Sequence, residues 1–561
     1  MKSRTSFFNA TVLRKDITRF APAWGLYLTA MLLVLLTVLT DTDYHLAVDM
    51  GLTINLLSIV NLGYALVCGA LLFGDLFNHK LCNAMHAMPL RREGWFLTHL
   101  VSGLLFSVVP NLVVALCLLP RLGLYWYVSF IWLGGVTAVY LFFFGAAVLS
   151  AMCTGSRFAM TLVYGLINFL AILAMWMLQF LYEPLLFGIE IDQSPFVFFS
   201  PVTYLCTNEL NYVNFLDKIT GFYNPNDGWP YTLGIACVGG MMLIGALLIY
   251  RKRHLESAGN FVTVRALSPV FLVLYTLTAG MILFIFSYIF ATDYGYLFLA
   301  VGIVVGFITG RMLLSRTVRI FKPGTFIGLA VMMAVLFGSL GLAQLDVLGI
   351  VRWVPEPEDV ATVSICYAYD DFAYTARDSG EIEELRALHG QLVEDRAETE
   401  SWNTHIYLTY TLRDGSTVTR RYGLDYSKEA GREVTLWLCK PEYLLQAPDL
   451  SKLAGTVNYI TVDTFSQEVL ENKEYIFGED EVQGLLEAII ADCRAGAMCQ
   501  DTGYRYTYQH ADQWGYLTLE KAGDRDVHLY IWNDAGNIIR WVTEHADDAI
   551  KSNIAVADKM P

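Results

Sequence analysis

Charged residues are scarce in this chain of 561 residues, because Asp, Glu, Lys and Arg make up only 16% of it. Soluble domains carry about 25%, so a wholly soluble enzyme is excluded. No Gly-Lys dipeptide occurs, and the phosphate-binding loop G-x-x-x-x-G-K-[S/T] is therefore absent. The patterns H-E-x-x-H, C-x-x-C and G-x-S-x-G are absent as well. The sequence thus predicts no catalytic, cofactor-binding or metal site of its own and no intrinsic enzyme activity.

The ten cysteines follow no regular spacing. Six occur at or before Cys237, in or between apolar runs, and the others are Cys366, Cys439, Cys493 and Cys499. We expect structural thiols. A Cys493–Cys499 bridge is the alternative, because disulfides persist outside the cytosol.

Apolar residues are abundant: they form 55% of the chain, with a mean hydropathy of +0.45. The net charge of −15 is nevertheless that of an acidic soluble protein. The apolar excess and the negative charge belong to different parts of the chain, which divide after Asp346. Residues 1–346 contain 19 Lys and Arg against 15 Asp and Glu, and the remainder contains 19 against 38. The chain therefore consists of a membrane half followed by an acidic, water-soluble half.

The membrane half contains nine apolar runs that could cross a bilayer, for which a helix needs about 20 residues. The first and eighth are short. The predicted fold is an α-helical polytopic membrane protein of about nine transmembrane helices, followed by a soluble α+β domain. The runs are Trp24–Leu39, Leu52–Phe73, Trp95–Leu119, Val128–Ala151, Phe158–Tyr182, Tyr231–Tyr250, Leu267–Phe290, Tyr294–Gly310 and Phe326–Leu345.

Lysines and arginines in the short loops predict the orientation. Alternate threading from a cytoplasmic N-terminus puts 17 of them on the cytoplasmic side, and only Arg121 and Lys218 on the other. With nine spans, the acidic half is then extracellular. If the eighth run were only re-entrant, that half would be cytoplasmic, but the cluster from Arg311 to Lys322 would lie on the wrong side.

Two local patterns accompany the spans. Apolar residues between Phe8 and Phe20 recur at helical spacing among basic ones, which predicts a cytoplasmic amphipathic helix within residues 1–21 on the membrane surface. Gly302, Gly306 and Gly310 form overlapping GxxxG steps, which allow close helix packing in lipid, within the chain or across a dimer. Ionisable residues such as His99 occur only near the predicted ends of spans, where we expect them to be solvated.

The loop after the second span has the composition of a short helix stopped by Pro89. Residues 73–80 (FGDLFNHK) and 86–92 (HAMPLRR), with the aromatic pair Trp95 and Phe96, resemble permeases of bacterial ATP-binding-cassette (ABC) transporters of the type-2 export class. Residues 251–259 (RKRHLESAG) resemble the basic R-x-x-E-x-A-G turn of one branch of that family. The resemblance covers roughly the first 260 residues.

The resemblance implies a surface helix, a six-span core over residues 22–260 and a coupling helix at residues 75–90 that docks on a cytoplasmic ABC ATPase. ATP would act only through that partner, in a homodimer or in a heterodimer with a second permease, in a bacterial plasma membrane and without nucleic acid. Three additional transmembrane helices over residues 261–346 and a C-terminal extension depart from the six-span pattern. The candidate ATPase-coupling residues are Asp75, Leu76, Phe77, Asn78, His79, Lys80, His86, Pro89, Arg91 and Arg92, and those of the second cytoplasmic loop are Arg251, Arg253, Glu256 and Gly259.

Two pieces are expected outside the cell. The loop Glu183–Pro230 is rich in aromatic residues, which fits either an exit gate for an amphiphilic substrate or an aromatic belt. Residues 350–561 are long enough for one domain or two small ones, and their acidic excess fits either a solvated acidic surface beside anionic lipid or wall polymer, or the attraction of a cationic peptide. Within them we expect helices at Ile382–Leu392 and Val482–Ile490, a hairpin joining Tyr407–Leu412 to Ser416–Thr419, and strands at Trp514–Leu519, His528–Trp532 and Ile538–Val542.

Two functions fit these features. The first is the membrane-spanning permease subunit of an ABC-type exporter, driven by a separate ATPase, that moves or extracts an unidentified substrate. The alternative is a membrane sensor that binds an extracellular ligand through residues 350–561 without transport.

Overall fold

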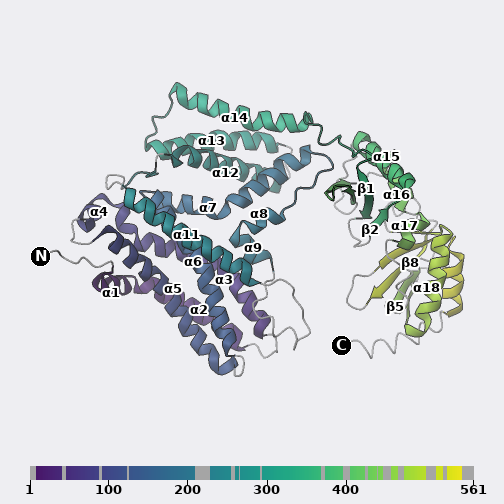
Figure 1. Cartoon of the computed structure of the whole chain (residues 1–561), viewed down its shortest axis with the longest axis horizontal. Helices are drawn as coiled ribbons and strands as arrows, with labels where there is room; N and C mark the ends of the chain where they lie inside the picture. Colours follow the sequence, from purple (N-terminus) through teal and green to yellow (C-terminus); the bar gives the residue numbers. More distant parts are fainter. Residues whose placement is uncertain are drawn as a thin grey trace. The chain divides into compact units, whose positions relative to one another are not determined.

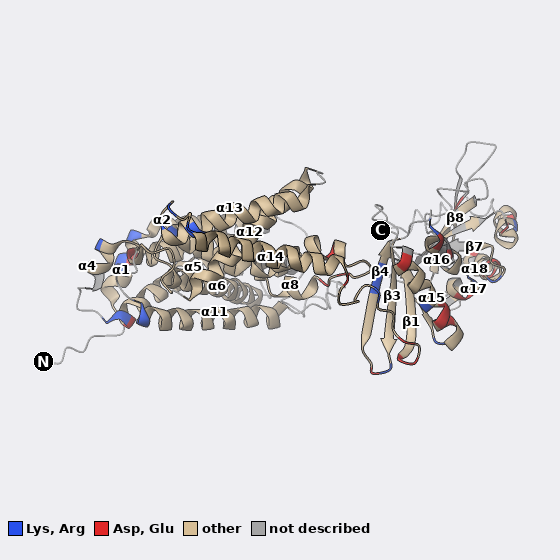
Figure 2. Ribbon diagram, turned by 90° about the horizontal axis from the view of Figure 1, so that it is seen from above, with Lys and Arg blue, Asp and Glu red and all other residues tan. Residues whose placement is uncertain are grey.

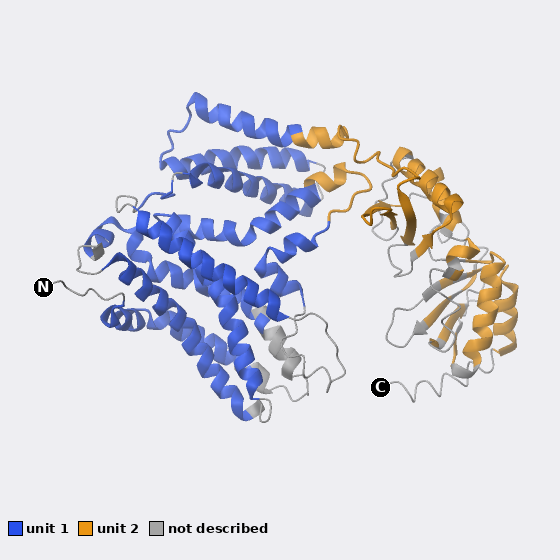
Figure 3. Ribbon diagram, viewed as in Figure 1, with its two compact units in different colours: residues 1–180, 192–338 blue, residues 181–191, 339–561 orange. Residues whose placement is uncertain are grey.

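Figure 1 shows a computed structural model of the whole chain. The chain divides into a helical unit, residues 1–180 and 192–338, and a C-terminal unit, residues 181–191 and 339–561 (Figure 3). The structure describes residues 8–40, 46–86, 91–122, 126–208, 228–253, 259–264, 266–290, 294–367, 373–395, 405–423, 428–438, 440–446, 457–464, 473–500, 513–521, 527–532 and 534–545.

The helical unit begins with a short helix, α1 (Ala10–Arg19), at the predicted amphipathic segment. Asn9 caps it by accepting hydrogen bonds from the backbone N–H groups of Thr11 and Val12. Within the described residues, nine apolar helices, one on each predicted run, and several short ones follow. The apolar helices are α2 (Ala21–Thr40), α3 (Leu46–Leu72), α5 (Arg92–Leu122), α6 (Tyr127–Cys153), α7 (Arg157–Met177), α11 (Gly228–Lys252), α12 (Leu267–Ile289), α13 (Gly295–Ser315) and α14 (Pro323–Gln344).

Seven helices within the described residues are long and apolar enough to cross a membrane. An eighth results if α1 and α2, which meet at 63°, count as one bent span. The described apolar part of α3, Leu57–Leu72, is shorter. The predicted class of a polytopic helical membrane protein is therefore confirmed, with seven to eight candidate spans in the described part of the chain.

Helix α6 lies at the centre of the helical unit and packs against α3, α5, α7 and α11. Its backbone touches that of α11, because a methyl group at Gly145 would lie 2.5 Å from the carbonyl oxygen of Gly239. Buried polar groups also join helices. The hydroxyl of Tyr27 in α2 lies 3.0 Å from Oδ1 of Asn61 in α3 and 3.2 Å from Oδ1 of Asn111 in α5.

The three glycines of α13 lie against α12. A methyl group at Gly302 would lie 2.8 Å from the carbonyl oxygen of Ala279, and one at Gly306 would lie 2.6 Å from Cβ of the same residue. Gly310 faces Leu272 and Tyr275. The small residues thus bring two neighbouring helices of the same chain into backbone contact.

The C-terminal unit is α+β, as predicted, with two small antiparallel sheets. The first has the order β2-β1-β3-β4 and the second β6-β5-β8-β9-β7. The strands are β1 (Val360–Tyr367), β2 (Ala373–Ala376), β3 (His405–Leu412), β4 (Thr417–Gly423), β5 (Val457–Thr464), β6 (Lys473–Phe477), β7 (Met498–Gln500), β8 (Gln513–Lys521) and β9 (Val527–Trp532), and the helices are α15 (Ser379–Asp395), α16 (Glu429–Leu438), α17 (Pro441–Gln446) and α18 (Glu479–Arg494).

The two sheets repeat one arrangement. In each, two strands are followed by a helix, two more strands and a further helix, and the strand order β2-β1-β3-β4 matches β6-β5-β8-β9. The first module ends with α16 and the second with a helix over residues 536–545. The C-terminal unit therefore contains a tandem ββαββα module, with β7 as an addition to the second copy.

Most local predictions for this unit are confirmed. The hairpin forms between β3 and β4, with Gly415 at φ +86°, and the predicted helices and the strands near residues 514–519 and 528–532 are present. The strand at Ile538–Val542 is wrong, because residues 536–545 form a helix. Ala535, Ile538 and Val542 are buried at spacings of three and four residues, a helical period that prevails over the β-branched composition.

Candidate coupling surface of the helical unit

Lysines and arginines gather at one end of the helical unit, around α1, α4 and the end of α11 (Figure 2). This end contains the loop that was predicted to contact an ATPase. The loop folds into a 3₁₀ turn, η1 (Gly74–Phe77), and a short helix, α4 (His79–His86).

The turn η1 anchors the loop, and α4 presents a free face. Leu76 is only 2% exposed and Cys82 only 3%, so both side chains lie inside the unit. Lys80 and Leu81 are exposed, Leu81 by 46%. The amphipathic α4 therefore offers an apolar and a basic side chain at the surface.

Arg253 joins this loop to two spans. Its Nη1 donates to the carbonyl oxygens of Ala151 at 2.8 Å and Met152 at 3.3 Å, and its Nη2 donates to that of Leu76 at 3.3 Å. Ala151 and Met152 lie in the last turn of α6, where free carbonyl groups favour a cation. Burial lowers the pKa of the Arg253 guanidinium. One side chain at the end of α11 thus connects α6, α11 and η1.

Weaker ion pairs surround this contact. Arg251 lies 3.4 Å from Glu93, and Arg19 lies 4.0 Å from Asp75. Arg92 donates to the carbonyl oxygen of Arg253 at 3.4 Å. Exposed pairs of this kind stabilise a protein by about 0–1 kcal/mol each. They therefore contribute little to the stability of this end of the unit.

Gly259 brings the second loop against the first. Its N–H donates to the carbonyl oxygen of Gly155 at 2.6 Å, and its φ of +78° favours glycine. A methyl group at Gly259 would lie 3.1 Å from Nε2 of His79 in α4. The structure therefore brings residues of both predicted cytoplasmic loops together.

The remaining predicted residues are placed as follows. Asn78 accepts a hydrogen bond from the N–H of Lys80 at 2.9 Å, and Phe77 is half-buried. Arg91 precedes α5 and is exposed. His86 ends α4, but its side chain, like Pro89 and Glu256, lies outside the described residues.

A buried polar cluster, missed by sequence analysis, fastens α1 to α5. Nδ1 of His99 lies 2.7 Å from Oδ2 of Asp16, which also accepts a hydrogen bond from Ser102 at 2.8 Å. Asp16 is 4% exposed and His99 3%. The expectation that His99 is solvated is therefore wrong. The signal was available, since Asp16 is the only acidic residue in the amphipathic segment and faces inward on the helix.

The aromatic loop is divided between the two units. In the helical unit, α8 (Ser194–Phe198) and α9 (Pro201–Thr207) carry Phe198 and Tyr204, whose rings contact that of Tyr231 at 5.2 and 3.9 Å. The predicted aromatic residues Tyr212, Phe215, Phe222 and Tyr223 lie outside the described residues.

Residues 181–191 of the same loop belong to the C-terminal unit and bind strand β4. The N–H of Arg421 donates to the carbonyl oxygen of Gly188 at 3.0 Å, and its guanidinium lies 3.4 Å from Glu190. Phe187 packs against Tyr422 at 5.3 Å. The C-terminal unit thus includes a segment from just after α7, which is more than 140 residues before residue 339 in the sequence.

Other local chemistry is limited. Cys493 is a free, buried thiol, so it forms no bridge to Cys499, and burial raises its pKa to about 12. Among the described residues, no group of three or more His, Cys, Asp or Glu side chains is arranged to hold a metal ion.

Comparisons with protein-family models, curated proteins and solved structures give no match to this chain. The fold defines its class: the protein is a multi-pass membrane protein with a C-terminal α+β unit.

Proposed function

We propose that the chain is the membrane-spanning subunit of an ABC-type exporter and works with a separate cytoplasmic ATPase. The observation that carries this proposal is the η1–α4 element, which is anchored by Leu76 and Arg253 and presents an exposed basic and apolar face. Its place in the sequence agrees with the coupling helix implied by the resemblance to type-2 permeases.

The orientation belongs to the same proposal. With nine spans and α4 in the cytoplasm, the basic end of the helical unit faces the cytoplasm, as the charge rule requires. The acidic C-terminal unit then lies outside the cell. Residues 22–260 form the six-span core, and α12, α13 and α14 form the addition.

The contacts suggest how ATP would drive the protein. Closure of the ATPase would press on α4, and η1 would move with it. Because Arg253 binds η1, α6 and α11 at once, that displacement would reach two spans of the core. The two permease subunits of a dimer would then separate on the outer side. The substrate is an unidentified, amphiphilic molecule that contacts the aromatic side chains of α8 and α9.

Affinity purification of the tagged full-length chain from native membranes tests this proposal. An ABC ATPase should be recovered with it. Leu81→Glu places a charge on the free face of α4 and should reduce recovery of the ATPase about tenfold or more, as expected at a central contact. Leu436→Glu changes a leucine of the C-terminal unit that is even more exposed, 67% against 46% for Leu81, and is the control. Recovery of no ABC ATPase would contradict the proposal.

A second candidate is a sensor whose C-terminal unit binds an external ligand without transport. A cavity among aromatic and charged residues of that unit favours it. Reconstitution with the ATPase separates the two functions, because ligand-dependent ATP turnover without substrate flux would favour sensing.

A further inference from the structure

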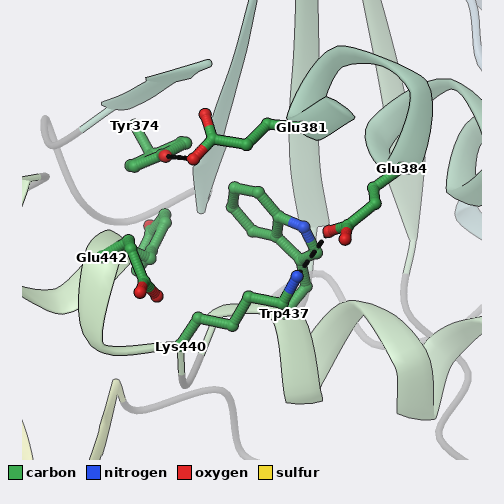
Figure 4. A pocket seen from close by; sticks show the side chains of 7 residues that line it. Tyr374, Glu381, Glu384, Trp437, Lys440 and Glu442 are labelled. Atoms are coloured by element: carbon green, nitrogen blue, oxygen red, sulfur yellow. Dashed lines mark hydrogen bonds and ion pairs between the residues drawn. The ribbon is translucent and has the colours of Figure 1, made fainter. Parts of the chain in front are cut away.

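A cavity of about 420 Å³ lies between α15 and α16 of the first ββαββα module and the helix that follows it, α17. Its size is within the range of small-ligand sites, about 300–1,000 Å³. A second cavity of about 320 Å³ adjoins it and shares Glu384, Trp437 and Lys440. Figure 4 shows the side chains that line the first cavity.

Three aromatic rings form one part of the lining. Trp437 meets Tyr374 edge-on at 5.0 Å and Tyr443 at 6.0 Å, and the two tyrosine rings are 6.1 Å apart. Trp437 is 7% exposed, and its indole N–H points towards Glu384 without completing a hydrogen bond (Figure 4). The negative faces of such rings attract organic cations.

Carboxylates form the other part. Glu381, Glu384 and Glu442 line the cavity with a single cation, Lys440, so its formal charge is negative. Tyr374 donates a hydrogen bond to Glu381 at 2.7 Å. Burial and the neighbouring Glu381 raise the pKa of Tyr374, which keeps its hydroxyl a donor at neutral pH. The cavity thus combines aromatic faces with an excess of negative charge.

The ammonium group of Lys440 occupies this combination of carboxylate and aromatic ring. Its Nζ lies 2.5 Å from Oε2 of Glu384 and 5.4 Å from the centre of the Trp437 ring. The ion pair lowers the pKa of Glu384. An ammonium group of the chain itself therefore lies where a carboxylate and an aromatic ring meet, at the boundary of the two cavities.

In the described part of the second module, the position that corresponds to Glu384 is filled. Gly484 follows the buried Val482 of α18 by two residues, as Glu384 follows the buried Ile382 of α15. A methyl group at Gly484 would lie 2.9 Å from Nε1 of Trp541, so the indole packs directly on α18. Where the first module has a carboxylate and space, the second has a glycine covered by tryptophan.

We propose that the groove between α15 and α16–α17 binds an organic cation, a primary ammonium or guanidinium group on an aliphatic chain. The cation displaces Lys440 from Glu384 and Trp437, and its chain extends past Leu436 in the adjoining cavity. Such a group is carried by free polyamines and by Lys or Arg side chains of peptides. This inference does not depend on the transport proposal.

Equilibrium dialysis of the full-length protein in nanodiscs, with radiolabelled spermidine and with an Arg-containing tetrapeptide amide, tests it. Saturable binding of either probe is expected, and the probe that binds identifies the source. Glu384→Gln and Trp437→Leu should each weaken binding about tenfold. Lys440→Met should strengthen it several-fold, because it removes the internal competitor, whereas a merely structural role for Lys440 predicts no gain.

Matched controls separate the groove from the general acidity of the unit. Glu383→Gln removes the same charge from an exposed site on α15, and Arg413→Met removes a positive charge from the exposed β3–β4 turn. Both should leave binding unchanged. The proposal is overturned if neither probe binds saturably, or if Glu383→Gln weakens binding as much as Glu384→Gln does. A failed fold is recognised separately from the melting temperature of each variant.

Discussion

At the scale of single residues, His389 is a buried histidine at the core of the first module. Its Nδ1 lies 2.9 Å from the hydroxyl of Tyr410 and its Nε2 lies 2.7 Å from that of Tyr422. The ring is fully buried. Burial, with Arg420 and Arg386 nearby, lowers its pKa to about 4. The imidazole is therefore neutral at physiological pH.

This lowered pKa makes the stability of the module depend on pH. Between pH 6.5 and 4 the unfolded chain binds a proton at His389 that the folded chain does not, so stability is lost as pH falls. The loss should reach about 3 kcal/mol by pH 4. It can be measured from hydrogen exchange of β3 amides, corrected for intrinsic rates. In His389→Gln, stability should be lower at pH 7 but should fall less on acidification; an unchanged slope would contradict the assignment.

For Arg253, the sequence revealed the residue type, but only the structure revealed its contacts. Its basic character was visible in the R-x-x-E-x-A-G turn, and the resemblance placed it in a second cytoplasmic loop. That its guanidinium spans three carbonyl groups of α6 and η1 follows only from their approach in space. His99 shows the opposite outcome, because its burial against Asp16 requires α1 to fold back on α5.

At the scale of elements, the segment 181–191 packs against strand β4, although the two are far apart in the sequence. Gly188 has a φ of +78°, and a methyl group there would lie 2.3 Å from the Tyr422 ring. The same tyrosine binds His389 of α15, the helix that carries Glu381 and Glu384. A chain of packed residues therefore runs from the proposed cation site to the segment that follows α7.

Gly188→Ala should release this segment from β4. The positive φ is unfavourable for alanine, and the added methyl group would clash with the Tyr422 ring. We expect protection of residues 186–191 against hydrogen exchange to fall about tenfold or more, as for a loss of 1–3 kcal/mol. Gly415→Ala is the matched control, since it has a similar φ of +86° but open space around it. Equal loss of protection at residues 186–191 in both variants would show that the contact with Tyr422 is unimportant.

The success of element prediction depended on how local the signal was. The β3–β4 hairpin was predicted correctly because Arg413-Asp414-Gly415 specifies a turn between two alternating strands. The helix at residues 536–545 was predicted as a strand because Ile538, Ile539 and Val542 favour β-structure locally. Its burial pattern, decided by the core beneath it, has the helical period instead.

At the scale of the whole molecule, the Lys and Arg residues of the short loops determine the proposed topology. Asp414→Cys, in the exposed β3–β4 turn, should react with a membrane-impermeant maleimide on intact cells. Asn83→Cys, on the exposed face of α4, should react only after permeabilisation. The unsubstituted protein provides the background from its native thiols. Labelling of Asn83→Cys in intact cells, with none of Asp414→Cys, would reverse the orientation.

The sequence by itself determined the class of the protein, the apolar helices and the acidic α+β half, because hydropathy and charge are properties of each segment wherever it lies. Only the tertiary structure decided which segments meet. It buried His99 against Asp16, assigned residues 181–191 to the C-terminal unit, and revealed a tandem module whose two copies differ in one groove. These are contacts between residues distant in the chain, and their energies depend on packing that no local pattern contains. The scarcity of charge in the first half and its excess in the second were readable at once, whereas the place where Glu384, Trp437 and Lys440 converge required the fold.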